Sequence, residues 1–252
     1  MILLRSIAFA IWFFAITIAL ALIAPLLRLR GWRAALGHAR LWSTLVLGGV
    51  RVICGIRYEV SGREHLPVDS PALIASMHQS AFETFAWLQI APDLSFVVKE
   101  ELARIPIIGG LMRQAGMIVI DRAAGPAAMR RVIADAKALA AAGRPIVIFP
   151  EGTRVAPGRR ARLHPGVAGI AAHTGLPVTP VMTDSGLLWG RRSLIKRPGV
   201  VHIAIRPPIP AGTPREPLMA RLAEIFAEGS GLGTPVENSV GAAPHNFASK
   251  SS

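Results

Sequence analysis

The sequence predicts an α/β fold with a mostly parallel sheet flanked by helices, preceded by an N-terminal membrane helix. Two observations carry this prediction. From about residue 57 to residue 228, short and nearly continuous apolar segments alternate with segments of helical periodicity. Continuously apolar strands are typical of parallel sheets that are buried on both faces. An uncharged run from residue 7 to 27 comes before them. At roughly 1.5 Å per residue, it is long enough to cross a hydrocarbon core of about 30 Å.

The arginines around this N-terminal helix predict its orientation. Arg28, Arg30 and Arg33 follow the apolar run, whereas only Arg5 and the amino terminus precede it. By the positive-inside rule, this asymmetry places the rest of the chain on the cytoplasmic side of the inner membrane. We therefore expect residues 1–33 to form a membrane anchor helix with a basic flank. A cleaved signal peptide is the alternative, but arginines stand where a small-residue cleavage site would be expected.

A second apolar stretch runs from Leu41 to Ile56 and is interrupted by Arg51. It is too short for a second span, so residues 34–56 are predicted to form an interfacial helix that lies against the bilayer. An ordinary packing helix is the alternative. Residues 57–228 would then form the main globular domain, and the composition rich in Gly, Ser, Asn and Ala of residues 229–252 predicts a disordered tail.

Within the globular domain the pattern predicts seven strands and four helices. The strands are expected at or from 58–60, 72–76, 94–98, 117–120, 145–149, 178–182 and 200–205. The helices are expected at 81–88, from Pro126 to just before Gly143, at 167–173 and at 218–226.

Composition narrows the classes of partner. Hydrophobic residues make up 52% of the chain and the formal net charge is +13. An apolar and basic chain favours a membrane surface over nucleic acid, and no basic run is interleaved with aromatic residues as a base-stacking surface would be. Cys54 is the one cysteine. It excludes an internal disulfide and argues against a metal site built from cysteines, so we expect no metal and no nucleic-acid partner.

His78 and Glu83 form the first candidate site. His78 stands where a predicted strand gives way to a helix, and Glu83 follows five residues later. The two side chains can meet only if His78 precedes the helix and Glu83 lies in its first turn. Glu83 could then orient the imidazole, which would act as a general base. The alternative is a capping box, because Ser80 to Glu83 fits the Ser-x-x-Glu pattern; the two roles can coexist.

Further motifs follow in a fixed order. They are Lys99 and Leu102 with Pro106 and Gly109, then Asp121-Arg122, then Phe149-Pro150-Glu151-Gly152-Thr153-Arg154, and finally Leu176 to Val181. In this order and at these separations, residues 55–210 resemble the 1-acylglycerol-3-phosphate acyltransferases of the glycerolipid acyltransferase family. The first motif of that family is His-x4-Asp, and here Glu83 takes the place of the aspartate.

The resemblance implies an acyltransferase catalytic domain and roles for the motif residues. His78 would deprotonate the sn-2 hydroxyl of a lysophospholipid, which then attacks a fatty acyl thioester carried by coenzyme A or acyl carrier protein. Glu151 and Arg154 would hold the acceptor, with Gly152 and Thr153 shaping the turn. Arg122, Arg154 and Lys99 would grip its phosphate; solvated strand-end charges are the alternative for the two arginines. No bound cofactor is expected, since the acyl donor is a co-substrate.

Three other functions compete with phosphatidic acid synthesis. Acylation of lyso-ornithine lipid or another lysophospholipid would use the same chemistry on a different acceptor. A serine hydrolase or thioesterase is disfavoured because the sequence has no Gly-x-Ser-x-Gly elbow. A non-catalytic membrane-binding module would bind lipid without turnover.

Overall fold

A seven-stranded sheet forms the centre of the computed structural model, which describes residues 1–27, 30–67, 70–91 and 93–230. The strand order is β1-β7-β6-β2-β5-β3-β4. All neighbouring strands are parallel except β6 and β7, which are antiparallel. The strands are β1 (Ile56–Ser61), β2 (Leu73–Ser76), β3 (Ser95–Lys99), β4 (Ile118–Ile120), β5 (Ile146–Ile148), β6 (Val178–Thr183) and β7 (Gly199–Ile205). The predicted fold class is therefore confirmed.

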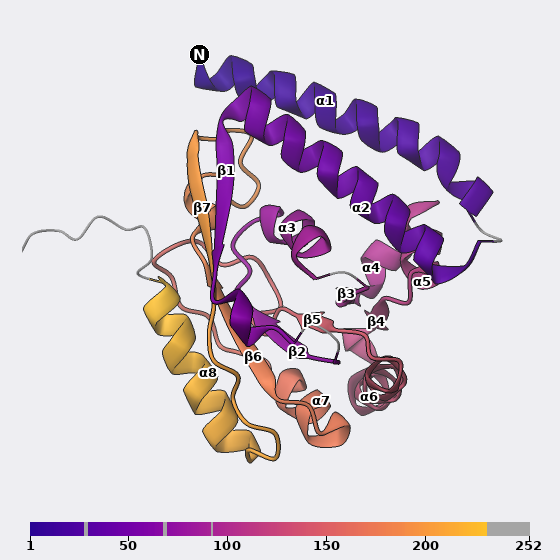
Figure 1. Cartoon of the computed structure of the whole chain (residues 1–252), viewed down its shortest axis with the longest axis vertical. Helices are drawn as coiled ribbons and strands as arrows, with labels where there is room; N and C mark the ends of the chain where they lie inside the picture. Colours follow the sequence, from indigo (N-terminus) through magenta and orange to yellow (C-terminus); the bar gives the residue numbers. More distant parts are fainter. Residues whose placement is uncertain (28–29, 68–69, 92, 231–252) are drawn as a thin grey trace, which may run out of the picture.

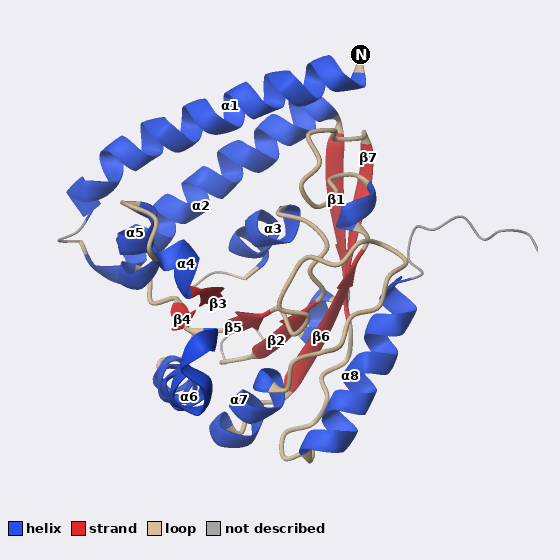
Figure 2. Cartoon of the chain, turned by 180° about the vertical axis from the view of Figure 1, so that it is seen from behind, coloured by secondary structure: helices blue, strands red, loops and turns tan. Residues whose placement is uncertain are grey.

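Helices cover both faces of this sheet (Figures 1 and 2). One face carries α1 (Ile2–Ile23), α2 (Gly31–Gly49), α3 (Phe82–Ile90), α4 (Glu100–Ala103) and α5 (Ile108–Gln114). The other carries α6 (Gly125–Ala141), α7 (Gly166–Thr174) and α8 (Arg215–Ser230). Successive residues of a strand point to opposite faces. Accordingly Ile74 packs into the core under α3, whereas Leu73 and Ala75 pack into the core under α7 and α8.

The first two helices form an antiparallel pair that lies over α3 (Figure 1). The indole of Trp12 donates to the Leu45 carbonyl (3.0 Å), and the indole of Trp42 donates to the Thr17 hydroxyl (2.9 Å). Ile2–Leu26 is the one described segment that is long and apolar enough to cross a membrane. Its outward face is an exposed apolar stripe, which we call the α1 stripe: Leu4, Ile7, Ile11, Phe14, Ile18 and Leu22.

The seven predicted strands and four predicted helices of the globular domain lie where expected, to within a few residues at their ends. The helix predicted over residues 34–56 is observed as α2, which begins three residues earlier at Gly31 and is continued by a π-helical segment over Val50–Cys54. The segment from Ile105 to Gly110, which carries the motif residues Pro106 and Gly109, contains the start of α5. There Gly109 packs so closely on the Ala103 carbonyl that an added Cβ would clash.

The division of the chain into an anchor, an interfacial helix, a catalytic domain and a tail stays a prediction. Its boundary at residues 33 and 34 falls inside α2, and α8 continues to Ser230, two residues into the predicted tail. Arg28 and residues 231–252 lie outside the described residues.

Candidate active site

The predicted motifs meet at one edge of the sheet. His78 follows β2, the Phe149–Arg154 turn follows the neighbouring strand β5, and Lys99 ends β3. These strands are parallel, so their carboxyl ends lie at the same edge, where α/β folds place ligands. Two backbone contacts fasten the first two motifs together. The His78 carbonyl accepts from the Val155 N–H (2.7 Å), and the His78 N–H donates to the Glu151 carboxyl (2.6 Å).

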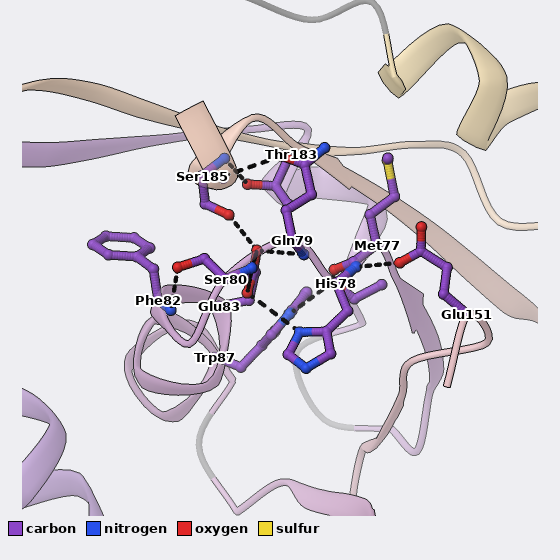
Figure 3. A network of polar contacts seen from close by, with 12 residues as sticks. Met77, His78, Gln79, Ser80, Phe82, Glu83, Trp87, Glu151, Thr183 and Ser185 are labelled. Atoms are coloured by element: carbon purple, nitrogen blue, oxygen red, sulfur yellow. Dashed lines mark hydrogen bonds and ion pairs between the residues drawn. The ribbon is translucent and has the colours of Figure 1, made fainter. Parts of the chain in front are cut away.

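The imidazole of His78 lies against the carboxylate of Glu83 (Figure 3). The distance between His78 Nδ1 and Glu83 Oε2 is 3.4 Å. This is within reach of an ion pair, yet Nδ1 has no well-aligned hydrogen-bond partner among the described residues. Such contacts are commonly loose before substrate binds and tighten in the reactive complex. His78 precedes α3, and Glu83 is the second residue of that helix. This is the arrangement that the spacing in the sequence required for the two side chains to meet.

Glu83 also caps the start of α3. Its carboxylate accepts the backbone N–H of Gln79 (3.0 Å) and of Ser80 (3.0 and 3.1 Å). The third donor to this carboxylate is the buried hydroxyl of Ser185, which follows β6. The capping role therefore coexists with the contact to His78. With its side chain almost wholly buried and held by three donors, Glu83 presents Oε2 to the ring in a fixed position.

A second contact fixes the plane of the imidazole. The ring of Phe149 stacks on the ring of His78, with centroids 4.2 Å apart and an angle of 23° between the planes. Phe149 is in turn stacked on Phe96 (6.2 Å, 14°). The imidazole is therefore held edge-on by Glu83 and face-on by Phe149. No described residue forms a hydrogen bond with its Nε2.

Glu151 is buried beside the His78 backbone, and its contact with the acceptor stays a prediction. Its carboxyl is 5% exposed and bonds to the backbone of His78, and Glu151 is not among the described residues that line the cavity. Burial raises the pKa of Glu151 to about 8; the negative charge of Glu83 adds to the increase, and the bond from the His78 N–H opposes it. At neutral pH the side chain is therefore uncharged, and it joins the two motifs.

A cavity of about 630 Å³ opens beside His78. Its polar end is lined by His78, Lys99, Gly152, Thr153 and Arg154, together with Arg191 and Arg192. Its apolar end is lined by residues of four helices, namely Leu20 and Ala21 of α1, Ala35, Ala39 and Trp42 of α2, Leu88 of α3, and Leu111 and Met112 of α5, and by Ala115, which follows α5. A cavity of this size with a few convergent polar groups is typical of a small-molecule site.

The predicted site residues are thus largely brought together. Lys99, Gly152, Thr153 and Arg154 share the cavity with His78. Gly152 has a φ of +64°, which glycine adopts without strain and which lets the turn fold back. The phosphate contact of Arg122 stays a prediction, because its side chain is outside the described part of the structure. No group of His, Cys, Asp or Glu within the described ranges could hold a metal ion.

Several residues of the site were not predicted. Gln79 lies in the first motif, and its side-chain oxygen accepts from the Gly186 N–H (3.1 Å). Ser185 stands 102 residues after Glu83, and no local pattern connects the two. Arg191 and Arg192 also line the cavity, which the sequence did not predict because their position depends on how the loop after β6 folds.

Comparison with known proteins gives a consistent result. A family model described as Acyltransferase matches residues 57–184. The 1-acyl-sn-glycerol-3-phosphate acyltransferase of Pseudomonas aeruginosa is 34% identical over 66% of this chain and 64% of its own length. The human 1-acyl-sn-glycerol-3-phosphate acyltransferase alpha is 27% identical over 66% of this chain and 59% of its own length. The matched part of the chain thus spans slightly less than two thirds of these curated relatives.

Among solved structures, the fold is similar to that of PlsC from Thermotoga maritima, a 1-acyl-sn-glycerophosphate (LPA) acyltransferase. The TM-score is 0.74 at 23% sequence identity, and the match covers 91% of this chain and 96% of that one. At this identity the likeness concerns the fold alone.

Proposed function

We propose that this chain, which belongs to the acyltransferase family, transfers a fatty acyl group from an acyl thioester to the sn-2 hydroxyl of lysophosphatidic acid. The product is phosphatidic acid, and the enzyme serves phospholipid synthesis. The donor carrier is coenzyme A or acyl carrier protein, and no bound cofactor takes part.

One observation carries this proposal: an oriented imidazole lines the same cavity as a set of basic residues and a larger set of apolar residues. The basic region suits the phosphate of the acceptor, since Arg154 and Lys99 can neutralise it and a guanidinium can bind two of its oxygens. The apolar region suits a fatty chain, whose burial contributes about 0.8 kcal/mol per CH₂. The thioester carbonyl would then lie where the two regions meet, beside His78.

The reaction needs one group that accepts and returns a proton. His78 Nε2 takes the proton of the sn-2 hydroxyl as the alkoxide oxygen attacks the thioester carbonyl. The tetrahedral intermediate collapses, the carbon–sulfur bond breaks, and the imidazolium returns its proton to the leaving thiolate. Glu83 stabilises the imidazolium through Nδ1 while that positive charge exists. No covalent acyl-enzyme forms, so binding both substrates in the correct orientation supplies much of the rate enhancement.

The α1 stripe supports a membrane location. It is the outer face of a helix whose inner face is packed on the rest of the protein, so it is free to enter lipid. We place the protein at the inner membrane with its catalytic domain on the cytoplasmic side, where the basic flank of α1 favours it. The bilayer then supplies the lysophospholipid acceptor.

The test is a purified assay of the full chain in mixed micelles. Labelled acyl-coenzyme A and acyl-acyl carrier protein are offered with lysophosphatidic acid or lyso-ornithine lipid. We expect phosphatidic acid to form and His78→Ala to lower the rate by about 10²–10⁴-fold or more, since one general base is removed. His173→Ala is the matched control, because His173 is exposed on α7 and away from the cavity.

Three results would contradict the proposal. Full turnover by His78→Ala would remove the imidazole from the mechanism. Faster acylation of lyso-ornithine lipid than of lysophosphatidic acid would show that the basic region does not select a phosphate. Release of free fatty acid without acylation of any acceptor would identify a thioesterase.

A further inference from the structure

The cavity beside His78 contains more positive charge than the acceptor needs. The charged side chains other than histidine that line it, among the described residues, are Lys99, Arg154, Arg191, Arg192 and Glu101. A phosphate monoester carries about −1.5 to −2 charges at pH 7. Lys99 and Arg154 alone balance that charge. Arg191 and Arg192 remain at the same cavity, and after the charge of Glu101 is subtracted they leave about one positive charge in excess.

The surplus arginines have no acidic partner. Within the described ranges, neither Arg191 nor Arg192 forms an ion pair with a carboxylate. Arg191 Nη1 donates to the Arg154 carbonyl (3.2 Å), which fastens its loop to the turn after β5. Arg192 has no hydrogen bond to another described side chain. Unpaired guanidinium groups that line a cavity are available to an anionic ligand.

The two pairs of cations come from opposite sides of His78. Lys99 and Arg154 follow β3 and β5, on one side of β2 in the sheet, whereas Arg191 and Arg192 stand in the loop after β6, on the other side. An acyl transfer brings two substrates to the imidazole, and each carries phosphate. The topology thus adds a second basic segment to the cavity, and Arg191 joins it to the first at the Arg154 carbonyl.

The loop that carries these arginines is held in place. The Lys196 N–H donates to the Ser6 hydroxyl of α1 (2.9 Å), and the buried Lys196 ammonium donates to the Leu194 carbonyl (3.0 Å). The Lys196 ammonium also lies 5.0 Å from the centre of the Trp189 ring. Arg192 itself has a φ of +55°, in a turn closed by the Ser193 N–H and the Gly190 carbonyl (3.2 Å). Glycine or asparagine is usual at such a φ, so an arginine there adopts a backbone conformation that is unfavourable for it.

We infer that Arg191 and Arg192 form a second phosphate-binding subsite, which takes the phosphate of the pantetheine arm of the acyl donor. This inference rests on the proposed function. Coenzyme A and acyl carrier protein both carry a phosphate on the 4′-oxygen of pantetheine, as part of a diphosphate in the first and of a serine phosphodiester in the second, so the subsite would serve either carrier. Arg192 makes the main contact, and Arg191 joins the subsite to the acceptor side through the Arg154 carbonyl.

The test uses Arg192→Asn, which removes the charge and tolerates a positive φ. Arg197→Asn is the matched control, because Arg197 is an exposed arginine in the same loop that does not line the cavity. We expect Arg192→Asn to raise the KM for acyl-coenzyme A about tenfold, the usual effect of losing a hydrogen bond to a charged group. The KM for acyl-pantetheine, which lacks the phosphate, and the KM for lysophosphatidic acid should match those of Arg197→Asn.

Calorimetric binding of 4′-phosphopantetheine and of pantetheine supplies a readout that does not need turnover. Wild-type protein should bind the phosphorylated probe more tightly, and Arg192→Asn should remove that difference. If the protein shows this binding pattern but transfers no acyl group, the proposed function fails and the subsite stands. An equal rise in KM for both donors, a rise confined to lysophosphatidic acid, or binding that ignores the phosphate would overturn the subsite.

Discussion

Replacing Glu151 with glutamine is expected to remove a large part of the pH dependence of stability. Burial holds the pKa of the folded-state carboxyl at about 8, against 4.5 for an unperturbed glutamate. Between these two values the folded protein keeps the proton and the unfolded chain releases it. The unfolded state therefore binds fewer protons, and the free energy of unfolding falls as the pH rises. Glutamine is uncharged at every pH and still offers an oxygen to the His78 N–H.

The size of the effect follows from the two pKa values. One pKa unit corresponds to 1.36 kcal/mol, so the full difference is on the order of 5 kcal/mol. Over the accessible range from pH 5.5 to 7.5, wild-type protein should lose on the order of 2 to 3 kcal/mol of stability relative to Glu151→Gln. Comparing the two proteins at each pH cancels the titration of all other groups.

The assay is chemical unfolding in detergent, followed by tryptophan fluorescence. Trp87 is fully buried on α3, where its indole donates to the Ser76 hydroxyl (3.1 Å), so it reports on the site. Glu224→Gln, on the exposed face of α8, controls for the loss of a carboxylate and should follow the wild type. Parallel stability curves for wild type and Glu151→Gln between pH 5.5 and 7.5 would refute the reasoning, because they would show that Glu151 is already ionised in the folded protein.

Three further predictions test the site and the membrane surface. Ser185→Ala should lower kcat about tenfold with little change in KM, because Glu83 loses one donor and holds the imidazole less firmly. Ser43→Ala, which removes another buried hydroxyl bond (2.7 Å to the Phe85 carbonyl), is the control and should leave kcat unchanged. Equal kcat values for the Ser185→Ala and Ser43→Ala variants would contradict the positioning role of Ser185. Ala39→Trp should fill the apolar end of the cavity and shift the preference toward shorter acyl chains, measured as the ratio of the rates with long-chain and short-chain acyl donors. An unchanged ratio would show that the acyl chain binds elsewhere. Replacing Ile11 and Phe14 of the α1 stripe by glutamate should weaken vesicle binding about 100-fold or more while activity in micelles persists, and full vesicle binding by this variant would exclude the stripe as the membrane surface.

Local information in the sequence accounts for most of the fold and for the centre of the site. Apolar periodicity over a few residues is enough to locate strands such as 72–76 and helices such as 218–226, because burial on a flat or a helical face has a fixed period. The contact between His78 and Glu83 was predictable for the same reason, since a short stretch of chain joins the two residues.

The remaining parts of the site depend on distances that no local pattern encodes. Glu151 stands in the motif as an acceptor contact, and only the tertiary structure reveals that its carboxyl is buried against the His78 backbone, where burial raises its pKa to about 8. The sequence predicts that α1 and α2 are membrane elements, yet in the structure residues of both helices also line the cavity.

By itself, the sequence determined the α/β architecture, the imidazole with its carboxylate, and the basic turn after β5, because each depends on residues that are close along the chain. The tertiary structure alone decided that Ser185 reaches Glu83, that Arg191 and Arg192 border the same cavity as Arg154, and that α1 and α2 close its apolar end. The physical reason is that a parallel sheet brings the carboxyl ends of distant strands to one edge, and the order in which the strands lie side by side is fixed only when the whole chain packs.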